Sequence, residues 1–175
     1  AGYKKDANGV RMKAVLDIIP YGEDWRRAGE YLKQAMGDIG IQLELRYEDV
    51  PTWLKRVYHN YDFEMNVNYF YQLPDPVLGV HRHYGTDQIR KGTHFVNSSR
   101  YSNPKLDALL DSGAGEPDAG KRTAKYKEIQ QILAEDMPVV NLFELEFLVV
   151  YNTKLKGVYD SAMGAYGSFR EGYLD

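Results

Sequence analysis

The chain has 175 residues and a formal net charge of −3. This length is enough for one domain with one sizeable core, and the acidic balance argues against a nucleic-acid partner, which would need a clustered basic face. There is no cysteine, which excludes disulfides and thiolate chemistry, and no apolar run approaches the roughly 20 residues of a membrane span. The 15 tyrosines against 6 phenylalanines suggest a recognition surface or a wet, half-buried core.

The first half of the chain alternates predicted strands and helices. A stretch that alternates at first and then becomes mostly apolar predicts a strand over 11–19 that enters a buried sheet, and an apolar stripe predicts an amphipathic helix that ends at Gly40. An alternating strand over 41–46, a short helix capped by Asp49 and a strand over 63–71 follow. This β-α-β-α-β order predicts an α/β fold with a mixed, mostly parallel sheet and flanking helices.

The most informative stretch is 69–76, Tyr-Phe-Tyr-Gln-Leu-Pro-Asp-Pro. Its two prolines end the predicted strand and force the chain to turn. Ligands of parallel sheets lie outside the carboxyl ends of the strands. Aromatic faces beside an amide and a carboxylate are typical of a small-molecule or peptide site. The alternative is a sheet's last buried aromatics followed by a polar turn.

The second half begins with an irregular region, 77–96, whose length and weak periodicity are typical of a binding loop or lid. Asn103 is expected to cap one helix and Asp118 to start a longer one. A strand-like segment follows over 139–151. From residue 153 the chain is rich in glycine and tyrosine, and we interpret this part as a tail that packs on a structure not present in this chain.

No convincing catalytic apparatus is visible. His81 and His83 would share one face of a strand, but no further ligand stands near them at a zinc spacing, so we interpret them as part of a polar loop. Glu144 and Glu146 could imitate a glycosidase pair, although adjacent same-face carboxylates usually form a solvated face. We therefore expect a binding protein and not an enzyme, with no catalytic residue, no cofactor and no metal site.

Several short sequence pieces stand in an order and at spacings that match a known family over nearly the whole chain. They are Ala1 to Asp6 with Gly9 and Arg11, Ile39-Gly40-Ile41, Trp53, Tyr61-Asp62, Asp75-Pro76, Phe95 with Asn97, 101–107, Arg122 with Tyr126, 130–138, and Gly157. In these pieces the chain resembles the C-terminal lobe of the family 5 extracellular solute-binding proteins, the dipeptide- and oligopeptide-type receptors of bacterial ABC importers.

This resemblance implies a periplasmic-binding-protein-like lobe of type II, cluster C. Residues 1–152 would form the C-terminal ligand-binding lobe of a longer protein, and 153–175 would return toward its N-terminal lobe. Such receptors enclose a solute between two lobes and deliver it to an ABC permease. The implied partners are a peptide-like or other small solute, the permease subunits and the missing lobe, with no nucleic acid. The implied location is periplasmic or extracellular, held at the membrane through the permease or an absent lipid anchor.

The resemblance also singles out Gln72. Peptide-binding members commonly carry a carboxylate about three residues before the Asp-Pro aspartate, where it pairs with the ligand's α-amino group, but this chain has Gln72 there. A neutral amide gives up a charge-assisted hydrogen bond, so either Asp75 supplies the charge or the ligand lacks a free cationic amine. The expected ligand-binding residues are Tyr69, Tyr71, Gln72 and Asp75, with Asn97, Arg82 and Trp53 as secondary candidates.

Two alternatives from other classes stay open. One is a carbohydrate-binding receptor or a small carbohydrate-active enzyme that uses aromatic platforms, and an enzyme would need two carboxyl groups that converge across a cleft. The other is a protein-interaction module that uses the tyrosine-rich tail.

Overall fold

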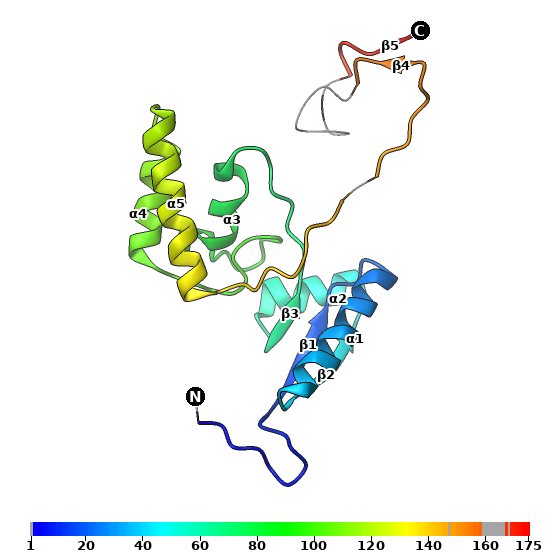
Figure 1. Cartoon of the computed structure of the whole chain (residues 1–175), viewed down its shortest axis with the longest axis vertical. Helices are drawn as coiled ribbons and strands as arrows, with labels where there is room; N and C mark the ends of the chain where they lie inside the picture. The colour runs from blue at the N-terminus through cyan, green and yellow to red at the C-terminus, as the bar shows by residue number, and fades with distance from the viewer. Residues whose placement is uncertain (1, 147, 159–166, 168) are drawn as a thin grey trace. The chain divides into compact units, whose positions relative to one another are not determined.

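The computed structural model describes residues 2–146, 148–158, 167 and 169–175 (Figure 1). The chain divides into two compact units. We call the first the sheet unit (Ala1–Tyr71 with Arg82–Ser102) and the second the helical unit (Gln72–His81 with Asn103–Asp175). Each unit is described by itself.

The sheet unit is built on three parallel strands in the order β2-β1-β3 (Figure 1). The central strand β1 (Met12–Ile18) pairs along its whole length with β2 (Ile41–Tyr47). The edge strand β3 (Met65–Val67) pairs only with Leu16–Ile18. The predicted parallel sheet is confirmed, and its strands are joined through helices as expected for such a unit.

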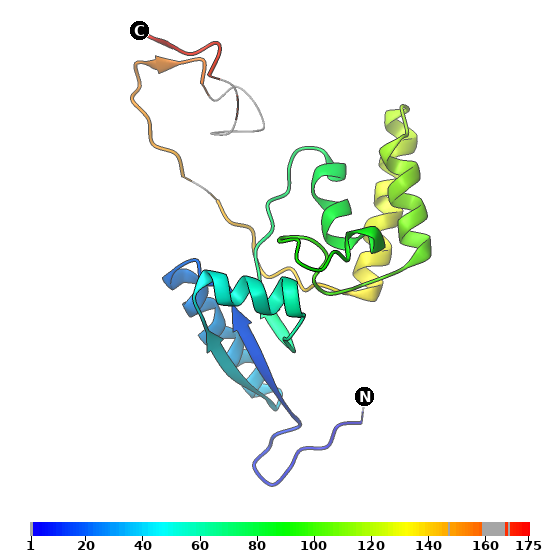
Figure 2. The same ribbon diagram turned by 180° about the vertical axis from the view of Figure 1, so that it is seen from behind.

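Helices cover both faces of this sheet, as the two opposite views show (Figures 1 and 2). Helix α1 (Glu23–Asp38) packs on one face, and α2 (Val50–Leu54) continues into a π-helical turn, η1 (Lys55–Asn60), on the other. The α1 face buries Ala14, Leu16, Ile18, Leu43 and Val67. The opposite face buries Ile19, Trp53, Val57, Tyr58 and Val96.

Strand β3 is much shorter than the predicted strand over 63–71, so that prediction was wrong in extent. The ladder ends because β1 stops at Ile18 and offers β3 no further partner. Directly after β3, Oδ1 of Asn68 accepts a hydrogen bond from the backbone N–H of Tyr69 at 2.8 Å. This local bond replaces a ladder bond and turns the chain out of the sheet.

The helical unit centres on the pair α4 (Pro104–Ala114) and α5 (Ala119–Asp136), which lie side by side in both views (Figures 1 and 2). Asn103 accepts from the first backbone N–H groups of α4, and Asp118 does so for α5, as predicted. The seam between the helices buries Leu106, Leu110, Ile129 and Ile132. Two short strands, β4 (Leu155–Lys156) and β5 (Tyr173–Leu174), pair antiparallel.

The region 77–96 is more regular than predicted. It contains η2 (Pro76–Leu78), α3 (Val80–Tyr84) and η3 (Thr86–Gln88), and the boundary between the two units falls within α3. The prediction of an irregular loop was therefore wrong for the residues in these turns. Single helical turns are too short to produce a readable apolar period, which explains the miss.

The predicted strand over 139–151 is not observed. Residues 139–146 and 148–151 form no strand, and Phe143 and Val150 are 54% and 96% exposed. A strand needs a neighbour for its N–H and C=O groups, and the described part of the chain places none beside this segment. Phe147 and most of the glycine- and tyrosine-rich tail, 159–166, lie outside the described residues. Among the described helices, none combines the length and apolarity needed to cross a membrane.

Candidate functional site

An aromatic cluster forms where β1 and β3 end. The ring of Tyr69 lies 5.9 Å from the ring of Trp25, and 6.2 Å from that of Tyr21 in an edge-on arrangement. Tyr69 is half-buried, and Tyr21 is 43% exposed. Because parallel strands end at the same edge of a sheet, residues after β1 and after β3 meet there. The cluster combines ring faces with phenol groups that can donate and accept hydrogen bonds.

A hydrogen bond to the buried side chain of Tyr58 supports the cluster. The hydroxyl of Tyr58 accepts a hydrogen bond from Nδ2 of Asn68 at 2.7 Å, which fixes the residue before Tyr69. Burial raises the pKa of Tyr58 to about 12, so its phenol is neutral at physiological pH.

The segment after Tyr69 is held from the side of α3. Arg82 donates through Nη2 to the backbone oxygen of Tyr71 at 3.4 Å, and its Nε is buried without a hydrogen-bond partner among the described residues. The ring of His83 lies on that of Phe70, with centroids 3.8 Å apart. Burial lowers the pKa of His83 to about 3, so this imidazole is a neutral packing group. Tyr71 is half-buried.

Two of the predicted site residues are buried in the sheet unit. Trp53 and Asn97 are each 1% exposed. Trp53 packs edge-on against Tyr58, and the side chain of Asn97 donates to the backbone oxygens of Gly85 at 3.0 Å and Tyr101 at 2.8 Å. These contacts give both residues a structural role, and neither side chain is accessible to a ligand from solvent.

In the helical unit, the carboxylate of Asp75 is already engaged. It accepts from the backbone N–H of Val77 at 2.9 Å as the cap of η2, and from Nη2 of Arg122 at 2.8 Å. The Val77 hydrogen bond, with the added contribution of Arg122, holds the pKa of Asp75 below its usual value. Gln72 is exposed, and a Cβ placed on Gly79 would clash with its Oε1. Gly79 therefore makes room for the Gln72 amide.

His81 and His83 do not form a pair. They lie on helix α3, not on a strand, and residues two apart on a helix point in different directions. His81 contacts the hydroxyl of Tyr126 through Nε2 at 3.0 Å, whereas His83 is buried. The described residues contain no cluster of three or more potential metal-binding side chains.

A buried ionic network lies in the sheet unit, and sequence reasoning missed it. Asp17 on β1 is fully buried, 3.3 Å from Nη1 of Arg46 and 3.6 Å from Nε of Arg56. Arg56 also binds Glu48 and Asp62, each at 2.6 Å. Burial raises the pKa of Asp17 to about 6, although both arginines oppose the shift. A charged residue inside an otherwise apolar strand was the signal that could have revealed it.

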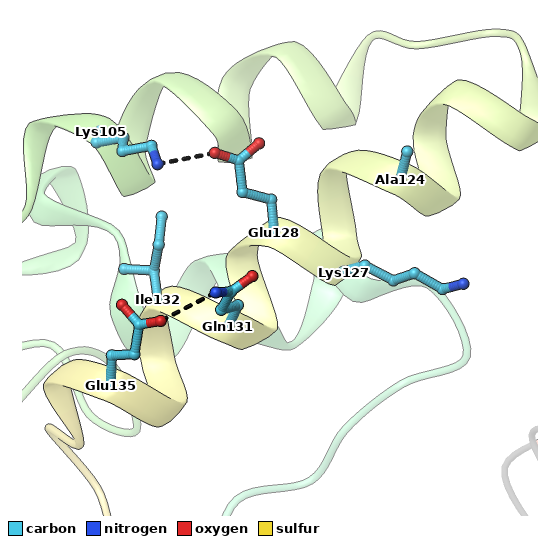
Figure 3. A pocket seen from close by; sticks show the side chains of 7 residues that line it. All are labelled: Lys105, Ala124, Lys127, Glu128, Gln131, Ile132 and Glu135. Carbon is cyan, nitrogen blue, oxygen red and sulfur yellow. Dashed lines mark hydrogen bonds and ion pairs between the residues drawn. The ribbon is translucent and has the colours of Figure 1, made fainter.

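The outer face of α4 and α5 carries a shallow hollow (Figure 3). Its lining is mostly charged or polar and contains no aromatic residue, and four of its side chains form two pairs. Lys105 binds Glu128 at 2.8 Å, and Gln131 donates to Glu135 at 3.0 Å, as the dashed lines show (Figure 3). None of the predicted ligand-binding residues lies in it.

Comparison with known proteins bears on the family. No family model matches the chain. It is 26% identical over 85% of its length to Di/tripeptide-binding protein 1 of Pseudomonas aeruginosa (strain UCBPP-PA14). It is 26% identical over 77% of its length to the probable D,D-dipeptide-binding periplasmic protein DdpA of Escherichia coli (strain K12). The chain spans 26% and 25% of the lengths of these two relatives, about a quarter of each.

Solved structures show the same fold. The chain matches NikZ from Campylobacter jejuni, in complex with Ni(L-His), with a TM-score of 0.79 over 95% of this chain and 34% of NikZ, at 19% identity. It matches the mannohexaose-bound periplasmic oligopeptide-binding protein of Thermotoga maritima with a TM-score of 0.67 over 78% of this chain and 26% of that protein, at 23% identity. The predicted resemblance to the family 5 solute-binding proteins is confirmed. The two relatives are named as binding proteins, and the fold is the predicted α/β fold, which the solved periplasmic binding proteins share.

Proposed function

We propose that this chain is a ligand-binding lobe of an ABC importer's substrate-binding protein. It binds a peptide or peptide-like solute and takes part in its delivery to a permease at the outer side of the membrane. The observation that carries the proposal is the similarity to a di/tripeptide-binding protein along 85% of the chain. The aromatic cluster at the carboxyl ends of the strands supports it, because ligands of parallel sheets bind at that edge.

In the sheet unit the proposed binding surface consists of Tyr69 and Tyr71, and in the helical unit we propose the exposed Gln72 as a separate ligand contact. Aromatic rings supply apolar contact area, and the phenols and the amide supply the few polar groups that orient a small ligand. Arg82 positions Tyr71 through its backbone oxygen. Trp53 and Asn97 act from inside the sheet unit by holding the scaffold.

The proposed ligand carries no free cationic amine at the position that Gln72 would face. Asp75 is a poor counter-charge for a ligand's amine, because its carboxylate already forms an ion pair with Arg122 at 2.8 Å. A second cation would have to displace that arginine. An N-blocked peptide, or another solute with a neutral hydrogen-bonding group, fits a neutral amide better.

The exposed apolar segment 139–151 and the tail 153–175 also fit a lobe of a longer protein. Val140, Leu148 and Val150 are 64%, 90% and 96% exposed. Such a run of exposed apolar side chains marks an interaction surface. We propose that this segment packs against the rest of a longer polypeptide, which would then enclose the solute together with this lobe.

The first test is ligand-induced stabilisation of the complete protein. A panel of free and N-acetylated di- and tripeptides is screened by thermal shift, since a ligand that binds only the folded state raises the melting temperature. Tyr71→Ala should abolish most of the shift. The matched control is Tyr31→Ala, because Tyr31 is 71% exposed on α1. Equal shifts in the unmodified protein and in Tyr71→Ala would remove the proposed site.

The second test concerns the charge of the ligand. The unmodified protein should bind N-acetylated peptides at least as tightly as free ones, and Gln72→Glu should reverse this preference. A charge-assisted hydrogen bond is about twice as strong as a neutral one, so the change is measurable by calorimetry. A strong preference for free amines in the unmodified protein would contradict the role given to Gln72.

A carbohydrate ligand is the second candidate. One similar structure, the Thermotoga maritima protein, holds mannohexaose, and aromatic clusters such as Tyr69 with Trp25 offer flat faces to sugar rings. Mannohexaose and shorter mannosides belong in the same thermal-shift panel. Stabilisation by the sugars and by no peptide would replace the peptide assignment while leaving the receptor role intact.

A further inference from the structure

Two histidines of the sheet unit contact each other on its surface. Neither belongs to the aromatic cluster of Tyr21, Trp25 and Tyr69. Nε2 of His59 lies 3.0 Å from Nε2 of His94, and both side chains are exposed. His59 comes from the π-helical turn η1, and His94 follows the turn at Gly92, 35 residues later in the chain. We propose that His59 and His94 form a two-imidazole binding site for a divalent transition-metal ion, with Cu²⁺ and Ni²⁺ favoured. The proposal does not depend on the peptide site.

The nitrogen–nitrogen distance carries the proposal. Nε2 atoms 3.0 Å apart are close enough to bind one ion, since metal–imidazole bonds are about 2.0–2.1 Å long. Two imidazoles with water suit the square-planar or tetragonal geometry of Cu²⁺ and Ni²⁺, whereas Zn²⁺ sites usually have three or four protein ligands. No group of three or more metal-binding side chains occurs among the described residues, so water would complete the coordination.

The fold holds the two rings together by contacts that do not involve the imidazole nitrogens. The backbone N–H of Gly92 donates to the oxygen of Tyr58 at 2.8 Å, which ties the His94 segment to η1. The buried ring of Tyr58 lies 5.9 Å from the ring of His94. These contacts hold the two backbone segments close together before a metal arrives, which reduces the conformational entropy lost on binding.

Backbone strain also concentrates next to the pair. His59 lies in a π-helical turn, a form that is rare and frequent at functional sites. Phe95, directly after His94, has φ 56°, and Tyr61, two residues after His59, has φ 54°. Left-handed backbone is costly for an aromatic residue and is found mostly where the surrounding fold requires it.

A metal would take the place of the hydrogen bond between the two rings. The ring centroids are 5.2 Å apart and the Nε2 atoms 3.0 Å apart, so the two nitrogens face each other almost directly. Binding therefore requires both rings to turn by roughly 40° until the two Nε2 atoms point at one ion. Exposed side chains can make this movement.

The test is a metal titration of the full chain with CuCl₂, NiCl₂ and ZnCl₂, followed by calorimetry and, for Cu²⁺, by electron paramagnetic resonance. We expect one Cu²⁺ per chain with two imidazole nitrogens in the spectrum, and tighter binding of Cu²⁺ and Ni²⁺ than of Zn²⁺. Loss of a residue that only orients a metal ligand weakens metal binding about 10–100-fold, so His59→Gln and His94→Gln, which remove a ligand itself, should each weaken it at least about tenfold. His81→Gln is the matched control and should bind as the unmodified protein does.

Three results would overturn the proposal. These are no saturable binding, a spectrum with a single imidazole nitrogen, and unchanged affinity in His59→Gln and His94→Gln. A second measurement needs no variant: sub-stoichiometric Cu²⁺ should broaden the ring signals of His59 and His94 in a proton–nitrogen spectrum before those of His81. Broadening of His81 first would place the metal elsewhere.

Discussion

Each unit contains an aspartate bound to an arginine, and the two carboxyls behave in opposite ways. In the sheet unit, burial raises the pKa of Asp17 to about 6 although Arg46 and Arg56 are close. In the helical unit, hydrogen bonds from Val77 and then Arg122 lower the pKa of Asp75. An ion pair on its own therefore does not fix the sign of a pKa shift; the balance of desolvation against hydrogen bonding does.

The same contrast separates the ways in which the two units are stabilised. The sheet unit encloses its central strand between helices, so its side chains are removed from water on both faces. The helical unit has one apolar seam, and its ion pairs, such as Lys105 with Glu128, lie at the surface. Burial should dominate the energetics of the first unit, and local hydrogen bonds those of the second.

The largest expected effect tests this contrast by truncation of leucines. Leu16 is 2% exposed in the sheet unit and Leu148 is 90% exposed in the helical unit. Leu16→Ala should lower the free energy of unfolding by about 2–5 kcal/mol, because it leaves a cavity in a packed core. Leu148→Ala should change it by no more than about 0.5 kcal/mol. Urea denaturation measures both, and an equal loss for the two variants would contradict the contrast.

The next effect concerns pH. The pKa of Asp17 is about 6 in the folded state against an ordinary value of 3.8, so the folded state binds the proton more tightly than the unfolded state. The ionised carboxylate therefore costs stability, and this cost disappears as pH falls through about 6 toward 3.8. The carboxyl should contribute a gain of roughly 2–3 kcal/mol in the free energy of unfolding over this window.

Asp17→Asn isolates that contribution. The amide is similar in size and cannot ionise, so the stability difference between the unmodified protein and the variant should move in favour of the unmodified protein as the pH falls. Urea midpoints between about pH 7 and about pH 4 give this difference. A difference that moves the other way would mean that Arg46 and Arg56 outweigh burial.

How much of the fold the sequence predicts depends on how local each determinant is. The β1-α1-β2 order and the caps Asp49, Asn103 and Asp118 were predicted, because each is encoded within a few residues. The length of β3 was not, since it depends on where the partner strand stops. The strand over 139–151 failed for a similar reason: its alternating residues are the pattern of a paired strand, and the described residues provide no pair.

The candidate site divides in the same way. The strand was expected to end at the two prolines, but β3 ends at Val67, where Asn68 turns the chain. Only the position of this segment after a parallel strand followed from the predicted order. Partners distant in sequence could not be foreseen. Arg122 reaches Asp75 across 47 residues and His94 reaches His59 across 35, and neither pair belongs to a spaced motif. The inward direction of Trp53 and Asn97 was likewise set by tertiary packing.

A smaller effect is expected from the cap of α4. Oδ1 of Asn103 accepts from the backbone N–H groups of Lys105 at 3.0 Å and Leu106 at 3.3 Å. Asn103→Ala leaves these groups without the side-chain acceptor and should lower the free energy of unfolding by about 1 kcal/mol. Asn103→Ser restores a capping oxygen and should recover most of the loss. Equal losses in the two variants would show that another contact of Asn103, its bond to Asp136, matters more.

The smallest effect returns to the aspartate of the helical unit. Arg122→Gln removes the guanidinium that binds Asp75 at 2.8 Å, so the lowered pKa of Asp75 should rise toward its usual value. The rise should be partial, because the hydrogen bond from Val77 is the larger cause of the shift and remains in the variant. A carboxyl-carbon NMR titration measures it, with Lys125→Gln as the control because Lys125 pairs with Glu116. A pKa of Asp75 that is equal in both variants would show that its charge is free, and Asp75 would then regain the role of counter-charge for a ligand's amine.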